Sequence, residues 1–138
     1  MSVQSFVEER RDAFIAMRRD FHMYPEPGWL EYRSAAKVAA RLIELGYDVA
    51  IGADVLDLDA RMGLPGDEIM KAAMNRAVEE GADPELVEKM GYGKTAIVAT
   101  MKFDDDGPTV AFRADMDSND VIESDEVGHI PADKGFRS

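Results

Sequence analysis

The chain has 138 residues, a length that suits one ordinary domain or one lobe of a larger one. Hydrophobic residues make up 46% of the chain and charged residues 32%, which is typical of a globular protein and not of a disordered one. The 16 basic and 28 acidic side chains give a net charge of −12, which argues against nucleic acid and anionic membranes as partners. The absence of cysteine excludes disulfides and thiolate metal ligands within this chain.

The start of the chain, from Met1 to Ser5, has neither the basic nor the apolar region of a secretory signal. No apolar run approaches the ~20 residues that a membrane helix needs. We therefore expect a soluble, cytoplasmic protein that does not associate with membranes.

Apolar side chains recur every three or four residues over residues 3–21, which predicts a helix with one apolar face. Pro25 and the Pro27-Gly28 pair then break this regularity. A second helix is predicted along the apolar positions from Ala35 to Leu45, with Gly46 placed as a left-handed cap. The alternating residues 47–51 predict a short strand.

Residues 52–93 combine turn signals with helical spacing, and we interpret them as a helical insertion between strands. Pro65-Gly66 indicates a turn, and residues 67–80 have helical spacing. Asp83 followed by Pro84 predicts an N-cap and first turn of a short helix that Gly91-Tyr92-Gly93 ends.

Two further strands are predicted over residues 95–101 and 109–113, both rich in branched side chains. The turn-forming loop 104–108 between them favours an antiparallel hairpin. Helices followed by strands and a polar loop are typical of an α/β fold, in which helices pack on a mixed sheet. Because functional groups gather just past strand ends, the loop after residue 113 is the first place to look for chemistry.

Asp115 and Asp117 follow the second of these strands and are two residues apart. In an extended segment both carboxylates point to the same side, within reach of one shared cation. Such a pair could bind a hard or borderline metal, or orient a metal-bound histidine from behind. On spacing alone, a solvated acidic loop, together with Asp120 and Glu123, is the favoured interpretation.

The two histidines have different settings. His22 lies near the end of the first predicted helix, where it could be a ligand, a proton shuttle or a structural side chain bonded to a carbonyl. His129 lies in a polar loop, and we expect it to be exposed. Two histidines without a cysteine do not make a closed zinc site.

Two signatures in order carry a family resemblance. The segment 18–28, followed by Glu31 and the helix ending at residues 42–49, resembles the amino terminus of the aminoacylase/carboxypeptidase-type zinc amidohydrolases, in the branch that hydrolyses N-acyl amino acids, hippurate and auxin conjugates. The segment 107–117 resembles their second signature. Within this branch, other segments resemble the p-aminobenzoyl-glutamate hydrolases: 61–65, 81–85, 119–124 and 135–136.

The resemblance implies that residues 1–138 are the amino-terminal, incomplete portion of a metallopeptidase-like catalytic domain, with 52–93 as an insertion. The parent would be a homodimeric amidohydrolase that uses divalent zinc or manganese to cleave the amide bond of a small N-acyl amino acid. Asp117 matches the aspartate that orients a metal-site ligand. Asp115 stands where relatives outside this branch have a metal-binding histidine. The remaining ligands and the catalytic glutamate would lie beyond Ser138.

On this basis we expect the chain alone to bind no metal stably and to be inactive, and the sequence does not identify the substrate-binding residues. The alternative interpretation is a non-catalytic acidic module that binds a partner protein or a cation.

Overall fold

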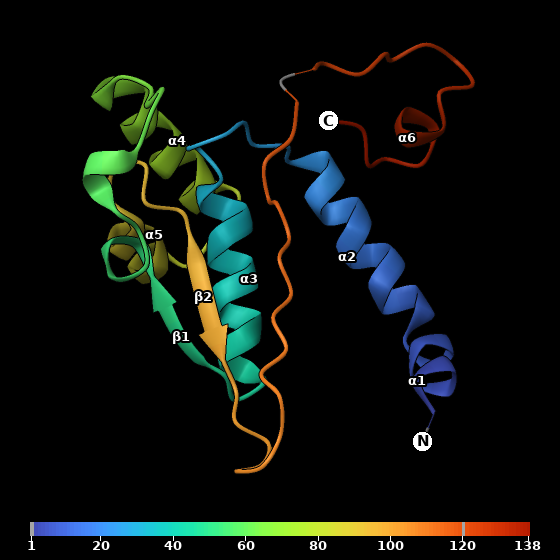
Figure 1. Ribbon diagram of the computed structural model, residues 1–138. Helices are drawn as coiled ribbons and strands as arrows, with labels where there is room; N and C mark the ends of the chain where they lie inside the picture. Colours follow the sequence, from blue (N-terminus) through green and yellow to red (C-terminus); the bar gives the residue numbers. More distant parts are fainter. Residues whose placement is uncertain (1, 120) are drawn as a thin grey trace. The chain divides into compact units, whose positions relative to one another are not determined.

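The computed structural model describes residues 2–119 and 121–138, and the chain forms two compact units (Figure 1). One unit consists of Met1–Pro25 with Asn119–Ser138, and the other of Glu26–Ser118. The assignment of all 138 residues to a single catalytic domain, with 52–93 as an insertion, stays a prediction. No helix within the described ranges is long and apolar enough to cross a membrane.

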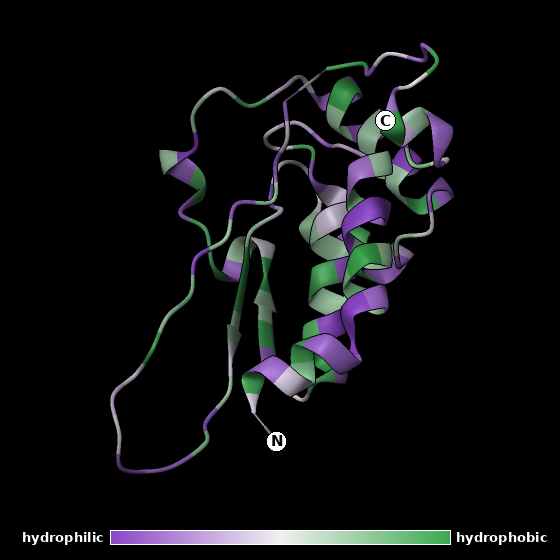
Figure 2. Ribbon diagram, turned by 90° about the vertical axis from the view of Figure 1, so that its right-hand side faces the viewer, coloured by the Kyte–Doolittle hydropathy of each residue, from purple (hydrophilic) through white to green (hydrophobic). Residues whose placement is uncertain are grey.

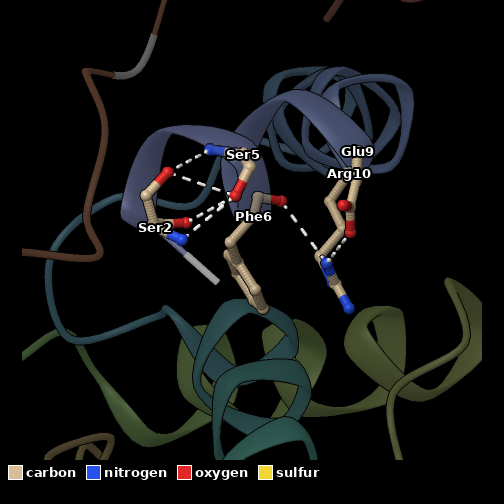
Figure 3. A network of polar contacts seen from close by, with 5 residues as sticks. All are labelled: Ser2, Ser5, Phe6, Glu9 and Arg10. Carbon is tan, nitrogen blue, oxygen red and sulfur yellow. Dashed lines mark hydrogen bonds and ion pairs between the residues drawn. The ribbon is translucent and has the colours of Figure 1, made fainter.

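The first unit contains α1 (Val3–Glu9), α2 (Arg11–Met23) and the short α6 (Ile130–Asp133). The single helix predicted over residues 3–21 is therefore wrong in one respect, because Arg10 interrupts it. The N–H of Arg10 donates to the Val7 carbonyl at 3.2 Å, a tighter turn than an α-helix makes. Its guanidinium lies 3.9 Å from the centre of the Phe6 ring (Figure 3).

A serine pair caps the amino end of α1. The Ser2 hydroxyl accepts the N–H of Ser5 at 3.1 Å, and the Ser5 hydroxyl accepts the N–H of Ser2 at the same distance (Figure 3). This reciprocal arrangement satisfies two donors that the first helical turn leaves free. Serine takes the place that glutamate or glutamine usually has in such a box, so the start of the helix has no obvious signature in the sequence.

In the second unit, α3 (Tyr32–Glu44) is the central helix. Ala35, Ala36 and Ala39 are fully buried on one face of it, and their small side chains allow neighbouring helices to approach closely. The helix ends in a Schellman motif at Gly46, which has φ +86° as predicted. Within this motif, Gly46 N–H donates to the Ile43 carbonyl and Tyr47 N–H to the Leu42 carbonyl.

The predicted helices of the 52–93 segment are confirmed as α4 (Asp67–Glu79) and α5 (Pro84–Met90), preceded by the short 3₁₀ turns Gly52–Asp54 and Leu58–Ala60. Asp83 caps α5 as expected, because its carboxylate accepts the N–H of Glu85 at 2.9 Å. Both helices pack against α3. The core that they form is buried and apolar, and it consists of Tyr32, Ala35, Ala36, Ala39, Ala73, Ala77, Ala82, Leu86, Val87 and Met90.

The sheet consists of β1 (Asp48–Ile51) and β2 (Ile97–Thr100), which pair antiparallel with Ile51 opposite Ile97. Helices packed against strands agree with the α/β class, although this sheet is antiparallel and not mixed. Both strands are largely hydrophobic in Figure 2. Val49, Ile51 and Ile97 are partly buried and pack against the helical core, so this register turns one face of the ladder toward the core.

The predicted hairpin between residues 95–101 and 109–113 is wrong. Only the first segment forms a strand, and its partner is β1. Residues 109–113 have strand-like composition, but no ladder among the described residues includes them. Phe112 is 95% exposed and Val110 69%, so no core covers the apolar face that would fix a register. Composition favoured a strand here, but pairing depends on a neighbour that composition does not specify.

Tyr32 ties α3 to the turn before β2. Its hydroxyl is buried and accepts the N–H of the buried Gly93 at 2.8 Å. Burial raises the pKa of the Tyr32 hydroxyl above its ordinary value of 10.0. Arg61 reaches the same turn, donating to the carbonyls of Tyr92 and Gly93.

We predict that Tyr32→Phe lowers the free energy of unfolding of the Glu26–Ser118 unit by about 1–3 kcal/mol, because the buried Gly93 N–H loses its acceptor. Urea titration followed by the fluorescence of Trp29, the one tryptophan in the sequence, measures this change within the same unit. Tyr92→Phe is the control: the Tyr92 side chain is half exposed, so the midpoint should stay unchanged. An unchanged midpoint in Tyr32→Phe would contradict the assigned role of this bond.

Candidate functional site

The segment that carries Asp115 and Asp117 leaves the sheet in extended form and ends at Ser118. The N–H of Ser118 donates to the Glu26 carbonyl at 2.9 Å, which fixes the end of this segment beside the start of α3. Both aspartates are exposed to solvent. Asp115 makes an ion pair with Arg113 at 2.6 Å, but both side chains are mostly exposed, so this pair contributes little to stability.

The described residues do not supply the donor set of a metal site. No group of three or more histidine, aspartate and glutamate side chains within these ranges could hold an ion. Asp115 is already paired with the guanidinium of Arg113, and Asp117 is exposed to solvent. Asp120, which the sequence groups with the acidic loop, lies outside the described residues. The two aspartates alone therefore fit part of a metal site at most, and their roles stay predictions.

His22 lies one residue before the end of α2 and bonds to a side chain far along the chain. Its Nε2 lies 2.9 Å from Oε1 of Glu123, and its ring meets the buried Phe136 edge-on at 5.5 Å. Of the three alternatives for His22, the structural role is therefore supported, but its partner is a carboxylate and not a helix-end carbonyl. Arg19 from the same helix stacks on Phe136 at 4.8 Å. These contacts hold the carboxy-terminal residues of this unit against α2.

His129 is not exposed, contrary to our expectation. It precedes α6, its side chain is half-buried, and its Nδ1 is buried without a hydrogen-bond partner among the described residues. The polar residues around it in the sequence suggested a solvated loop, but the chain continues into a short helix and the ring is half-buried. The hydrogen bond from His22 is the main cause that lowers the pKa of Glu123 below its ordinary 4.5, and the nearby His129 adds a smaller effect.

Glu26 is a residue of this region whose role was not apparent from the sequence. Its side chain is 1% exposed, and its two carboxylate oxygens accept the N–H groups of Arg33 at 2.8 Å and Ser34 at 2.7 Å. These donors belong to the first turn of α3, where the N-cap residue Glu31 makes no capping bond. A carboxylate between two prolines and ahead of a helix is the signal that could have indicated this cap.

Known proteins resemble the chain over nearly its whole length. It is 46% identical over 136 residues to the indole-3-acetyl-aspartic acid hydrolase of Enterobacter agglomerans and 40% identical over 137 residues to a p-aminobenzoyl-glutamate hydrolase subunit of Escherichia coli. Each match covers 99% of this chain and 31% of the relative. The chain is a homologue of these hydrolases. It spans less than a third of their length.

A solved structure supports the same conclusion. The aminobenzoyl-glutamate utilization protein from Klebsiella pneumoniae superimposes with a TM-score of 0.83 at 42% sequence identity, over 87% of this chain and 30% of that one. No protein-family model matches the chain. The identity and the superposition together confirm that this hydrolase homologue has the fold of part of a catalytic domain, as the two signatures indicated.

We predict that acidification weakens the contact between α2 and the carboxy-terminal residues in the first unit. The pKa of Glu123 is lowered in the folded state, so its stabilising contribution is fully present above pH 4.5 and is lost as the pH falls through the lowered value. NMR titration of the Glu123 carboxyl should show the depressed pKa in the native chain.

The His22→Gln variant should return the pKa of Glu123 toward its ordinary value, because the hydrogen bond from His22 is the largest cause of the shift. His129→Gln is the matched control and should have a smaller effect. Equal titration of Glu123 in the native chain and in His22→Gln would show that the pair does not persist in solution.

We also predict that the 138-residue hydrolase homologue releases no amine from p-aminobenzoyl-glutamate or indole-3-acetyl-aspartate when Zn²⁺ or Mn²⁺ is added, because its described residues do not assemble a ligand set. Chromatography of the products checks this. Turnover that Asp117→Ala abolishes would overturn the prediction.

Proposed function

We propose that this chain forms part of the catalytic domain of a metal-dependent amidohydrolase that cleaves the amide bond of N-acyl amino acids. The observation that carries the proposal is the 46% and 40% identity to two hydrolases across 99% of the chain. Identity at this level across 99% of the chain favours a shared reaction for the protein to which the chain belongs.

The substrates for which these relatives are named define a narrower class. Indole-3-acetyl-aspartate and p-aminobenzoyl-glutamate each consist of an acyl group with an aromatic ring, joined by an amide bond to an acidic amino acid. We propose a substrate of this class, with p-aminobenzoyl-glutamate as one candidate. A homodimeric parent and a cytoplasmic location remain part of the proposal.

Within this function, the chain supplies a scaffold and one supporting carboxylate. Asp117 is exposed at the end of an extended segment, where it can face residues outside this chain. We propose that it orients a ligand of a divalent zinc or manganese ion, and that Asp115 lies at the same edge of the site. The described donors are too few to hold such an ion, so the remaining ligands belong to other parts of the protein.

A hybrid enzyme tests the proposal. The 136 matched residues of the Enterobacter agglomerans hydrolase are replaced by this chain, and release of aspartate from indole-3-acetyl-aspartate is measured. We expect measurable hydrolysis, because the fold and nearly half of the residues are shared. A hybrid that is folded and binds metal but does not hydrolyse the substrate would contradict the proposed function.

In the same hybrid, we predict that Asp117→Ala lowers kcat/KM by roughly 10- to 100-fold, the usual effect of removing a carboxylate that orients a metal ligand. Asp106→Ala, in the exposed loop 104–108, is the matched control and should leave kcat/KM unchanged. Equal rates for the two variants would remove Asp117 from the proposed site.

A further inference from the structure

Glu26 makes contacts through both its side chain and its main chain. The carboxylate is buried at the start of α3 and accepts the N–H groups of Arg33 and Ser34. The carbonyl of the same residue accepts the N–H of Ser118 at 2.9 Å and its hydroxyl at 3.4 Å. All four residues lie in the Glu26–Ser118 unit. Glu26 therefore connects the central helix α3 to the end of the stretch 102–118, which carries Asp115 and Asp117 and is called the acidic segment below.

The acidic segment has little else to fix it. Residues 102–117 are extended or bent, and in the described chain they make no backbone–backbone hydrogen bond to another element. Met116 packs partly against the helical core, whereas Asp115 and Asp117 on either side of it are exposed. The bond that Glu26 makes to Ser118 is therefore immediately next to Asp117 and sets where the segment ends.

A buried carboxylate is a rigid anchor only when its charge is compensated. Moving an unpaired carboxylate out of water is costly. The Glu26 carboxylate stays buried because two short N–H bonds and the positive end of α3 stabilise its negative charge. The carboxylate cannot turn away without losing both bonds. The Glu26 carbonyl, attached to the same Cα, is held with it.

We propose that Glu26 is a positioning residue for Asp117: its buried carboxylate locks its own backbone to α3, and its carbonyl in turn holds Ser118 and so the neighbouring aspartate. This inference deepens the proposed function and rests on it for the role of Asp117. The contact itself can be tested without any catalytic assay.

The test is amide hydrogen exchange, observed by NMR, in the 138-residue chain. In the unmodified chain, the Ser118 amide should exchange more slowly than the amides of Asp115 and Asp117. In Glu26→Gln, an amide NH₂ must face one of the two backbone N–H donors, so the cap is half lost. We expect exchange at Ser118 to accelerate about tenfold or more, with shifted amide resonances at Asp117.

Tyr32→Phe is the matched control, because it destabilises the same unit through Gly93 without touching Ser118. At equal loss of global stability, it should leave the Ser118 exchange rate and the Asp117 resonances close to those of the unmodified chain. Faster exchange at Ser118 in Glu26→Gln alone supports positioning. Equal acceleration in both variants, or an unprotected Ser118 amide in the unmodified chain, overturns it.

These outcomes are separate from those of the hybrid enzyme. An inactive hybrid with a Ser118 amide that still depends on Glu26 contradicts the proposed function and leaves the contact in place. An active hybrid with a Ser118 amide insensitive to Glu26→Gln contradicts the positioning role alone. If Glu26→Gln does not fold, the exchange rate of Ser118 in the unmodified chain still decides whether the anchor exists.

Discussion

The buried carboxylate of Glu26 at the amino end of α3 is the interaction on which the second unit depends. Its charge replaces the capping side chain that the helix itself lacks, and it fixes where α3 begins. The alanine face that follows can then meet α4 and α5 at close range. An apolar core of this kind tolerates a buried charge only where helix N–H groups surround it, so the polar and apolar parts of the unit constrain each other.

Local patterns predicted the elements whose causes are local. The cap at Gly46, the N-cap at Asp83 and the spacing of α4 each depend on a few neighbouring residues, and each is confirmed. The strand predicted at 109–113 was wrong because a strand needs a partner, and the register that packs Ile51 and Ile97 against the core pairs β2 with β1 instead. Composition alone cannot determine non-local pairing.

The candidate site was only partly predictable for the same reason. The sequence indicated Asp115 and Asp117 by their spacing, and the structure places them on one extended segment. It did not indicate that Glu26, some 90 residues earlier, would hold the end of that segment, because this bond exists only in the folded chain. The family signatures led to the correct relatives, whereas spacing alone favoured a solvated acidic loop.

The extended stretch after β2 makes the chain sensitive to proteases. Lys102 and Arg113 are largely exposed there, on backbone that no ladder protects, and trypsin cleaves after both residue types. Within the Glu26–Ser118 unit, digestion would be concentrated at these two points, while the helices packed on α3 resist it. The piece beginning at Ala114 would still be bonded through Ser118 to the Glu26 carbonyl, so the nicked protein could retain its carboxylate pair after its covalent link to the sheet is gone.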